Sequence, residues 1–279
     1  MRRRIGGPVE LSLHTLLRGL PVGLISGIGG VLGSISGAWF QRSQSALALS
    51  NLVKLLPDAT PGDRRARMRA MWRNHGRVVT EFSCLARLRT PSRIQIVGAA
   101  ALPPPGQAVV IAASHTANWE ALSVAVMMDG RSVASIYQPQ ADATRNAIAL
   151  RRRRTLGWIG MSAKGNPLRE ALRHLTAGGA FVIYIDELRD DLVMAPTLGR
   201  ALLLDGNIKL AARMARLAAT PLVFADCERV AGARFRVTFT PVPPSAGGIP
   251  GDVKTLDAML ETVVRARPEQ WQMLRSLTF

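Results

Sequence analysis

The stretch Ala108-Val-Val-Ile-Ala-Ala-Ser-His-Thr-Ala-Asn-Trp-Glu120 decides the fold. Its first six residues are continuously apolar, which is typical of a parallel strand buried on both faces. His115 and Glu120 follow this run, and Asn118 between them is a residue type that often caps the start of a helix. The stretch therefore predicts a buried strand, a short loop that carries a histidine, and the first turn of a helix.

The same alternation of strand and helix continues along the chain to its end. Further strands are predicted at 132–137, 180–185, 221–225 and 234–240, and helices at 118–129, 142–155, 167–177, 205–217 and 252–267. This order predicts an α/β fold with a mostly parallel central sheet flanked by helices. The glycine-rich fingerprints GxGxxG and GxxxxGK[ST] of nucleotide sites do not occur in the sequence.

The N-terminal third has a different pattern. Residues 50–90 have helical periodicity, and Thr60 with Pro61 fits the start of a helix. The turn Pro103–Gly106 then breaks the helical pattern. We therefore expect a basic, apolar, membrane-associating helix at 1–45 and a second domain at 46–279, which is helical over 46–105 and α/β over 106–279.

Residues 19–41 form an uncharged run of 23 residues between Arg18 and Arg42. The run is long enough to cross or enter a bilayer, but it holds many glycines, several serines and a proline. Gly29, Gly33 and Gly37 recur at the spacing that lets helices pack closely. Three interpretations stay open: a membrane-embedded or interfacial helix, a buried helix of a soluble domain, and a cleaved signal.

Composition limits the classes of function. The chain has 279 residues, 48% apolar and 20% charged, which excludes a disordered or collagen-like protein. The net charge is +17, and residues 1–110 hold 15 basic and 4 acidic side chains. This excess suits a bilayer, a nucleic acid or an acidic carrier protein. Aromatics are only 5%, and helix-turn-helix or zinc-finger patterns are lacking, so we predict no nucleic-acid partner.

Cysteine and histidine spacing points to no metal and no disulfide framework. Cys84 and Cys227 are the only cysteines and lie far apart, which favours a reducing compartment. His14, His75 and His174 do not form a ligand pattern with His115, so we predict no metal site. We expect these three histidines to be structural or exposed.

His115 and Glu120 are the candidate catalytic pair. Five residues on a continuous helix correspond to 140° around the axis, so the two meet only if His115 lies in the loop and Glu120 in the first helical turn. That placement puts the imidazole at the carboxyl end of a strand, where open α/β sheets bind ligands. A carboxylate then holds one ring nitrogen and leaves the other to accept a proton. The pattern HxxxxE also fits an ordinary loop histidine and a helix-initiating glutamate.

Several blocks in order resemble the lipid A biosynthesis (lauroyl/myristoyl) acyltransferases, within the lysophospholipid acyltransferase-like group. The resemblance covers about residues 50–275. The matching blocks are Asn51-Leu52, Trp72–Arg77 with Glu81, Ser114–Glu120, Ile136–Pro139, Arg151–Arg154, Leu172–Asp186, Thr197–Arg200 and Arg267–Trp271. The chain differs from the family pattern at Gln138, at Glu187 and over Gln272–Ser276.

The resemblance implies transfer of a fatty acyl chain from a carrier thioester to a hydroxyl of a membrane glycolipid similar to a lipid A precursor. The implied donor is acyl carrier protein, with acyl-CoA as the alternative. A phosphatidylinositol mannoside acyltransferase and a non-catalytic basic membrane-binding protein are the other interpretations. The implied location is the cytoplasmic face of a bacterial inner membrane, and no cofactor is implied.

The same resemblance assigns roles to individual residues. His115 is the general base and Glu120 orients it, because a thioester is already activated and needs no covalent enzyme nucleophile. Arg153 is the implied substrate-binding arginine, with Arg152 and Arg154 as alternatives. Asp186 either holds that arginine or contacts the acceptor, and Arg200 is a weaker candidate for substrate binding.

Overall fold

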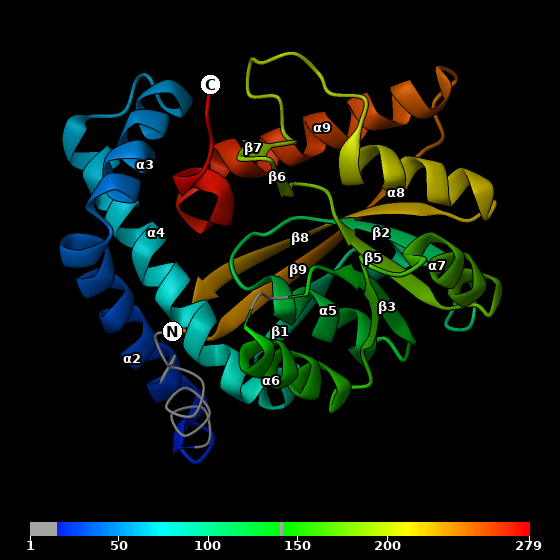
Figure 1. Cartoon of the computed structure of the whole chain (residues 1–279), viewed down its shortest axis with the longest axis horizontal. Coiled ribbons are helices and arrows are strands. Elements are labelled where there is room, and N and C mark those ends of the chain that lie inside the picture. The colour runs from blue at the N-terminus through cyan, green and yellow to red at the C-terminus, as the bar shows by residue number, and fades with distance from the viewer. Residues whose placement is uncertain (1–15, 140–141) are drawn as a thin grey trace.

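The computed structural model describes residues 16–139 and 142–279. The first part of the expected membrane-associating region, up to residue 15, and the expectation for His14 lie outside the described residues. Within them, a seven-stranded sheet forms the centre of the molecule, with helices on both of its faces (Figure 1). The α/β class predicted from the sequence is confirmed.

The sheet has the strand order β1-β9-β8-β2-β5-β3-β4. Neighbouring strands pair in parallel except β8 and β9, which are antiparallel. A two-stranded ribbon, β6 and β7, lies apart from this sheet. The strands are β1 (Ile94–Val97), β2 (Val109–Ala113), β3 (Val133–Tyr137), β4 (Ile159–Ser162), β5 (Ala180–Tyr184), β6 (Leu188–Arg189), β7 (Leu192–Val193), β8 (Leu222–Ala231) and β9 (Arg234–Val242).

The register between β2 and β5 positions the site. These strands are adjacent and parallel, and Ala113 lies opposite Tyr184. Two residues further along each strand, the chain reaches His115 and Asp186 at the same edge of the sheet. The carboxyl ends of β3 and β8 lie at that edge too, because both run parallel to their neighbours in this part of the sheet.

α-Helices, one π-helical turn (η1) and short 3-10 turns (η2 to η5) account for most of the rest of the described chain. They are α2 (Val22–Ile35), η1 (Ser36–Phe40), α3 (Arg42–Leu55), α4 (Pro61–Glu81), η2 (Phe82–Leu88), η3 (Ala99–Ala101), α5 (Trp119–Met128), α6 (Ala143–Arg154), α7 (Pro167–Thr176), α8 (Gly206–Leu217), α9 (Gly248–Ala266), η4 (Pro268–Gln270) and η5 (Gln272–Arg275). The predicted start of α4 is confirmed, because Thr60 and Asp63 form a reciprocal capping box. Asn118 caps α5 by accepting the backbone N–H of Glu120 at 3.1 Å.

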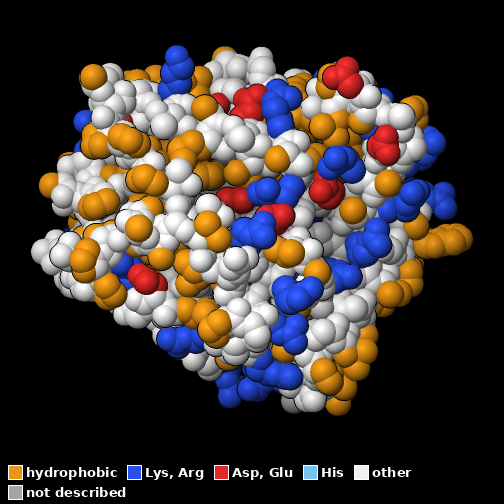
Figure 2. Space-filling view, turned by 180° about the vertical axis from the view of Figure 1, so that it is seen from behind, with side chains coloured by type: hydrophobic (Ala, Val, Ile, Leu, Met, Phe, Trp, Pro, Cys, Tyr) orange, Lys and Arg blue, Asp and Glu red, His pale blue; other side chains and the backbone are white. Residues whose placement is uncertain are grey.

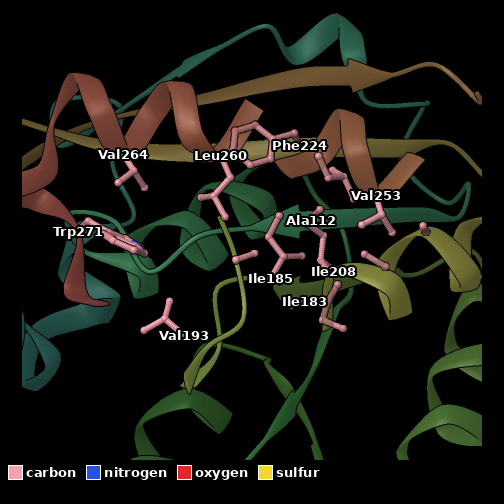
Figure 3. Packing of buried hydrophobic residues seen from close by; sticks show 14 of the residues in the cluster. Ala112, Ile183, Ile185, Val193, Ile208, Phe224, Val253, Leu260, Val264 and Trp271 are labelled. Carbon is pink, nitrogen blue, oxygen red and sulfur yellow. The ribbon is translucent and has the colours of Figure 1, made fainter. Parts of the chain in front are cut away.

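The strand β2 contributes to two hydrophobic cores because its side chains alternate between the faces of the sheet. Val110 and Ala112 belong to a core with helices α8 and α9, and Ile111 belongs to a second core with α5. Figure 3 shows the first core, where Leu260 of α9 and Ile208 of α8 lie against the sheet. Burial on both faces explains why the strand reads as one continuous apolar run.

Helix α2 packs along α4 through its glycines. A Cβ at Gly29 or Gly33 would overlap the backbone of α4 at Gly76 or Trp72, and one at Gly37 would overlap the Trp72 ring. Only residues without a side chain allow so close an approach. The opposite face of α2 and the following turn are exposed, with Val31 at 61%, Trp39 at 68% and Phe40 at 78% exposure.

Candidate active site

His115 lies in the loop that follows β2, and its partner is Asp186. The ring Nδ1 lies 2.8 Å from Oδ1 of Asp186, and the backbone N–H of His115 donates to both carboxylate oxygens at 2.8 and 3.1 Å. Asp186 is fully buried, whereas the His115 side chain is 22% exposed. A buried carboxylate held by several donors fixes the position of the imidazole.

The predicted contact between His115 and Glu120 is not the one found. Glu120 lies in the first turn of α5, as expected, but its carboxylate pairs with Arg153 near the end of α6. The guanidinium Nε donates to both Glu120 oxygens at 3.2 and 3.1 Å, and Nη2 donates to one of them. The two carboxylates have exchanged the partners expected from the sequence, because register places Asp186 opposite His115 while the turn of α5 directs Glu120 toward α6.

Arg153 is held by charge and by aromatic rings. Burial alone would lower the pKa of Arg153, but the charge of Glu120 and the hydrogen bonds that Arg153 donates to its carboxylate raise the pKa above its usual value. The guanidinium lies 5.1 Å from the Trp158 ring centroid and 5.7 Å from that of Phe82. Arg153 therefore stays charged and is held in one orientation, as binding of a substrate oxygen requires.

A small cavity joins these residues. Its volume is about 190 Å³. Tyr184, from the end of β5, stacks on the His115 ring with 4.5 Å between the ring centroids. The pKa of the Tyr184 phenol is raised, mainly by burial and in addition by the nearby charge of Glu120. The lining residues are His115, Trp119, Glu120, Ser123, Ser135, Ile136, Tyr137, Gln138, Arg153, Trp158 and Tyr184. His115, Glu120 and Arg153 thus meet in one cavity, with Asp186 behind His115.

The C-terminal segment forms the back of the site. The indole Nε1–H of Trp271, a fully buried side chain, donates to Oδ2 of Asp186 at 2.8 Å. The backbone of the histidine loop pairs with the same segment: Ala117 N–H donates to Gln270 O at 2.7 Å and Gln272 N–H donates to His115 O at 2.9 Å. The segment Pro268–Trp271 and the residue after it therefore position both His115 and Asp186.

A buried ion pair supports the loop from the other side. Arg229 of β8 makes two hydrogen bonds to Glu81 at the end of α4, at 2.6 and 2.9 Å, and Glu81 also accepts from Asn118 at 2.8 Å. Arg229 Nε donates to Asn74 at 2.7 Å. Residues of the N-terminal helices thereby fix the cap of α5 and the loop that begins at His115.

Two other predicted residues take structural positions. Arg200 donates to the backbone oxygens of Thr197, Pro196 and Thr278, and it is not among the described residues that line the cavity. His75 is half-buried, with Nδ1 3.1 Å from Oε1 of Gln272.

The thiols are poor candidates for a nucleophile. Burial raises the pKa of Cys84 to about 11 and that of Cys227 to about 12, so both stay protonated near neutral pH. Over residues 16–139 and 142–279, His, Cys, Asp and Glu side chains do not form a group of three that could hold a metal ion.

Sequence reasoning missed Trp271, Tyr184 and Trp158 as parts of this site. Trp271 and Tyr184 both lie in blocks that carry the family resemblance. The position of Tyr184 at the end of an apolar strand is a signal that could have placed it at the ligand edge of the sheet. Trp119, in the first turn of α5, also lines the cavity.

A histidine held by a buried carboxylate at the carboxyl edge of the sheet, beside a fixed arginine, is an arrangement that can provide a base and an oxygen-binding donor. The family model described as "Bacterial lipid A biosynthesis acyltransferase" matches residues 9–277. The chain belongs to this family, and its activity is acyl transfer to a lipid.

The chain is also similar to a solved structure. That structure is the 1-acyl-sn-glycerophosphate (LPA) acyltransferase PlsC from Thermotoga maritima, at 14% identity and a TM-score of 0.43, with 87% of this chain and 98% of that chain covered. A comparison with curated proteins found no match.

Proposed function

We propose that the chain transfers a fatty acyl group from a carrier thioester, preferably acyl carrier protein, to a hydroxyl of a membrane glycolipid similar to a lipid A precursor. The observation that supports this reaction most directly is the contact between Asp186 and His115, because His115 lines the same cavity as Arg153. A basic surface suits an acidic carrier protein.

The chemistry needs one base and one site for a developing negative charge. With Nδ1–H donated to Asp186, Nε2 of His115 takes the proton of the acceptor hydroxyl as its oxygen attacks the thioester carbonyl. The C–S bond then breaks, the oxygen ester remains, and the proton passes to the departing thiolate. The products are the acylated lipid and the free thiol of the carrier.

Arg153 is the proposed donor to the acceptor or to the tetrahedral oxyanion. Glu120 occupies Nε and Nη2, so the Nη1 edge is the one left for a substrate oxygen among the contacts of the described residues. Glu120 therefore acts in the site through Arg153 rather than through His115. Arg153→Ala should weaken transfer more than Arg151→Ala, since Arg151 lies outside this cavity.

The exposed face of α2 is the proposed membrane-associating surface, consistent with a region at 1–45 that attaches the enzyme to the inner membrane at its cytoplasmic face. Among the described residues, the helical stretch Val22–Phe40 is long and apolar enough to cross a bilayer, but 39% of its most apolar 18-residue window is buried against the rest of the protein. Figure 2 shows hydrophobic side chains at one edge of the molecule beside a band of basic ones.

An orientation along the membrane surface fits the packing better than a spanning one. Arg65, Arg69 and Arg73 lie exposed on α4, which packs on α2. A spanning α2 would carry these arginines into hydrocarbon at a cost of about 2.5–3.5 kcal/mol each. In the interface, the same arginines meet lipid headgroups at a gain of about 1 kcal/mol each.

The test of the proposed function is acyl transfer by the purified full-length chain. Acyl carrier protein and CoA carrying the same labelled acyl chain are compared as donors, with a lipid A precursor and phosphatidylinositol mannoside as acceptors in mixed micelles. We expect an acylated lipid A precursor, formed faster from acyl carrier protein. Faster use of acyl-CoA with the mannoside would favour the alternative substrates.

Membrane attachment has a separate test. Full-length protein should sediment with anionic vesicles, and high salt should release little of it, because salt screens charge but leaves apolar burial intact. Trp39→Ser with Phe40→Ser should move much of the protein to the supernatant. Full-length protein that stays wholly soluble at low salt would contradict the attachment.

A further inference from the structure

A second cavity, of about 150 Å³, lies beside the reaction cavity and is lined by three arginines. Arg18 comes from the turn before α2, Arg87 from η2 and Arg152 from the last turn of α6. The other described lining residues are Phe82, Ser83, Cys84, Leu85, Ala86 and Thr155. The described lining thus brings together three positive charges and contains no carboxylate.

The fold, rather than one charged helix, brings the arginines together. Arg87 donates from Nη1 to the backbone oxygens of Arg18 at 2.9 Å and Leu20 at 2.7 Å, which ties η2 to the turn before α2. The partial negative charge at the carboxyl end of a helix stabilises basic residues in its last turn, which explains the presence of Arg152 in α6. It does not account for Arg18 and Arg87, which reach the same cavity from two other elements.

The cluster is unfavourable without an anion. Burial lowers the pKa of Arg152, and the like charges of Arg18 and Arg151 lower it further. Like charges around a small, partly enclosed volume repel each other more strongly than charges in open water. An anion with several oxygens removes this repulsion, and planar guanidinium groups suit the oxygens of a phosphate.

The cavity adjoins the proposed reaction site. Phe82 lines it and also lies 5.7 Å from the guanidinium of Arg153, which lines the reaction cavity. Arg152 and Arg153 are neighbours on α6 and point into the two different cavities, as consecutive helical residues 100° apart can. The two cavities are therefore neighbours, within reach of one molecule.

We propose that Arg18, Arg87 and Arg152 form a binding site for a phosphate group of one of the two substrates. This inference rests on the proposed function for the identity of the molecule, but the phosphate site itself does not depend on it. The phosphate is either on the membrane lipid or on the phosphopantetheine arm of the soluble donor, and both present the same oxygens to the site.

The site is tested first by binding of inorganic phosphate to the full chain. Thermal unfolding in sodium phosphate is compared with unfolding in sodium chloride of equal ionic strength. At a phosphate concentration ten times its Kd, wild type should gain about 2–4 °C in Tm. Arg152→Gln should lose most of this gain, since loss of one charge-assisted hydrogen bond weakens binding about ten- to a hundredfold.

Arg151→Gln is the matched control, because Arg151 lies one residue earlier on α6 and does not line the cavity. It should keep the gain in Tm. An equal gain in Tm in wild type, Arg151→Gln and Arg152→Gln would contradict a phosphate site at Arg152. If Arg152→Gln does not fold, Arg18→Gln takes its place, with the same expected loss.

Steady-state kinetics then identify the source of the phosphate. A rise of about tenfold in the acceptor KM of Arg152→Gln, with an unchanged donor KM, would assign the site to the lipid phosphate. The reverse pattern would assign it to the donor arm, and no change in either KM would overturn the assignment to a substrate. If wild type transfers no acyl group, the proposed function fails, whereas the melting experiment still decides the phosphate site.

Discussion

Asp186→Asn tests how the histidine is oriented. In the structure the Asp186 carboxylate accepts from the His115 backbone N–H, lies 2.8 Å from the His115 ring Nδ1 and accepts from the Trp271 indole. Asparagine replaces one carboxylate oxygen of Asp186 with an amide NH₂, which is a donor and cannot accept from the donors that surround this position. It also lets the ring Nδ1 become an acceptor, so the proton moves to Nε2 and the base at the cavity is lost.

The expected loss in kcat is about 10²–10⁴-fold, the usual contribution of a positioned general base. Glu120→Gln is the informative comparison, because it disturbs Arg153 but leaves the tautomer of His115 unchanged. Its expected loss is about tenfold, from a weakened charge-assisted contact. The assay is initial-rate acyl transfer by purified variants, with thermal melting as the control for folding.

A folded Asp186→Asn enzyme with nearly unchanged kcat, next to a strongly impaired Glu120→Gln enzyme, would refute this reasoning. It would mean that Glu120 turns toward His115 when substrate is bound, as HxxxxE alone suggests. Equal and large losses of kcat in both variants would indicate that Asp186 and Glu120 act in one coupled network. In that case the effect on kcat of the double variant would differ from the sum of the two single effects.

Three further substitutions give distinct outcomes. Trp271→Phe keeps an aromatic ring but removes the donor to Asp186, so kcat should fall about tenfold with an unchanged acceptor KM; an unchanged kcat would remove Trp271 from the positioning group. Burial, and then the charge of Arg275, lower the pKa of His75 to about 4. The unfolded state therefore binds the extra proton between pH 6.5 and 4, so the free energy of unfolding should fall by about 3 kcal/mol as pH drops through this range, and His75→Asn should abolish the fall in urea titrations. Burial raises the pKa of Glu187 to about 7, and its buried Oε2 lacks a hydrogen-bond partner among the described residues. The folded state binds the extra proton in this case, so stability should fall as pH rises from 4.5 through 7. Glu187→Gln should be more stable than wild type by about 3 kcal/mol at pH 8 and by less than about 1 kcal/mol at pH 5; equal stabilities at both pH values would contradict the assignment.

The sequence predicted the strand and the loop of the site because both are local. The apolar run before His115 fixes a buried strand, and Asn118 fixes the start of the helix that follows. The element order likewise predicted a mostly parallel sheet. The cap at Thr60 depends on Asp63 only three residues away, and it too could be predicted.

Pairings across the sheet could not be predicted in the same way. Asp186 lies 71 residues beyond His115, and its contact follows from the register of β2 against β5, which no local pattern encodes. The antiparallel hairpin of β8 and β9 was missed for a similar reason, since only its second strand alternates clearly. The sequence also left open which arginine of α6 faces the site, because that depends on the rotation of the helix about its axis.

The measurement that tests the account most directly is the rate of acyl transfer by His115→Ala. The account predicts a loss of about 10²–10⁴-fold in kcat, with a melting temperature near that of wild type because the ring is only partly buried. Arg151→Ala, outside the reaction cavity, should retain most of the wild-type rate. A folded His115→Ala enzyme with wild-type kcat would contradict a general-base role for His115.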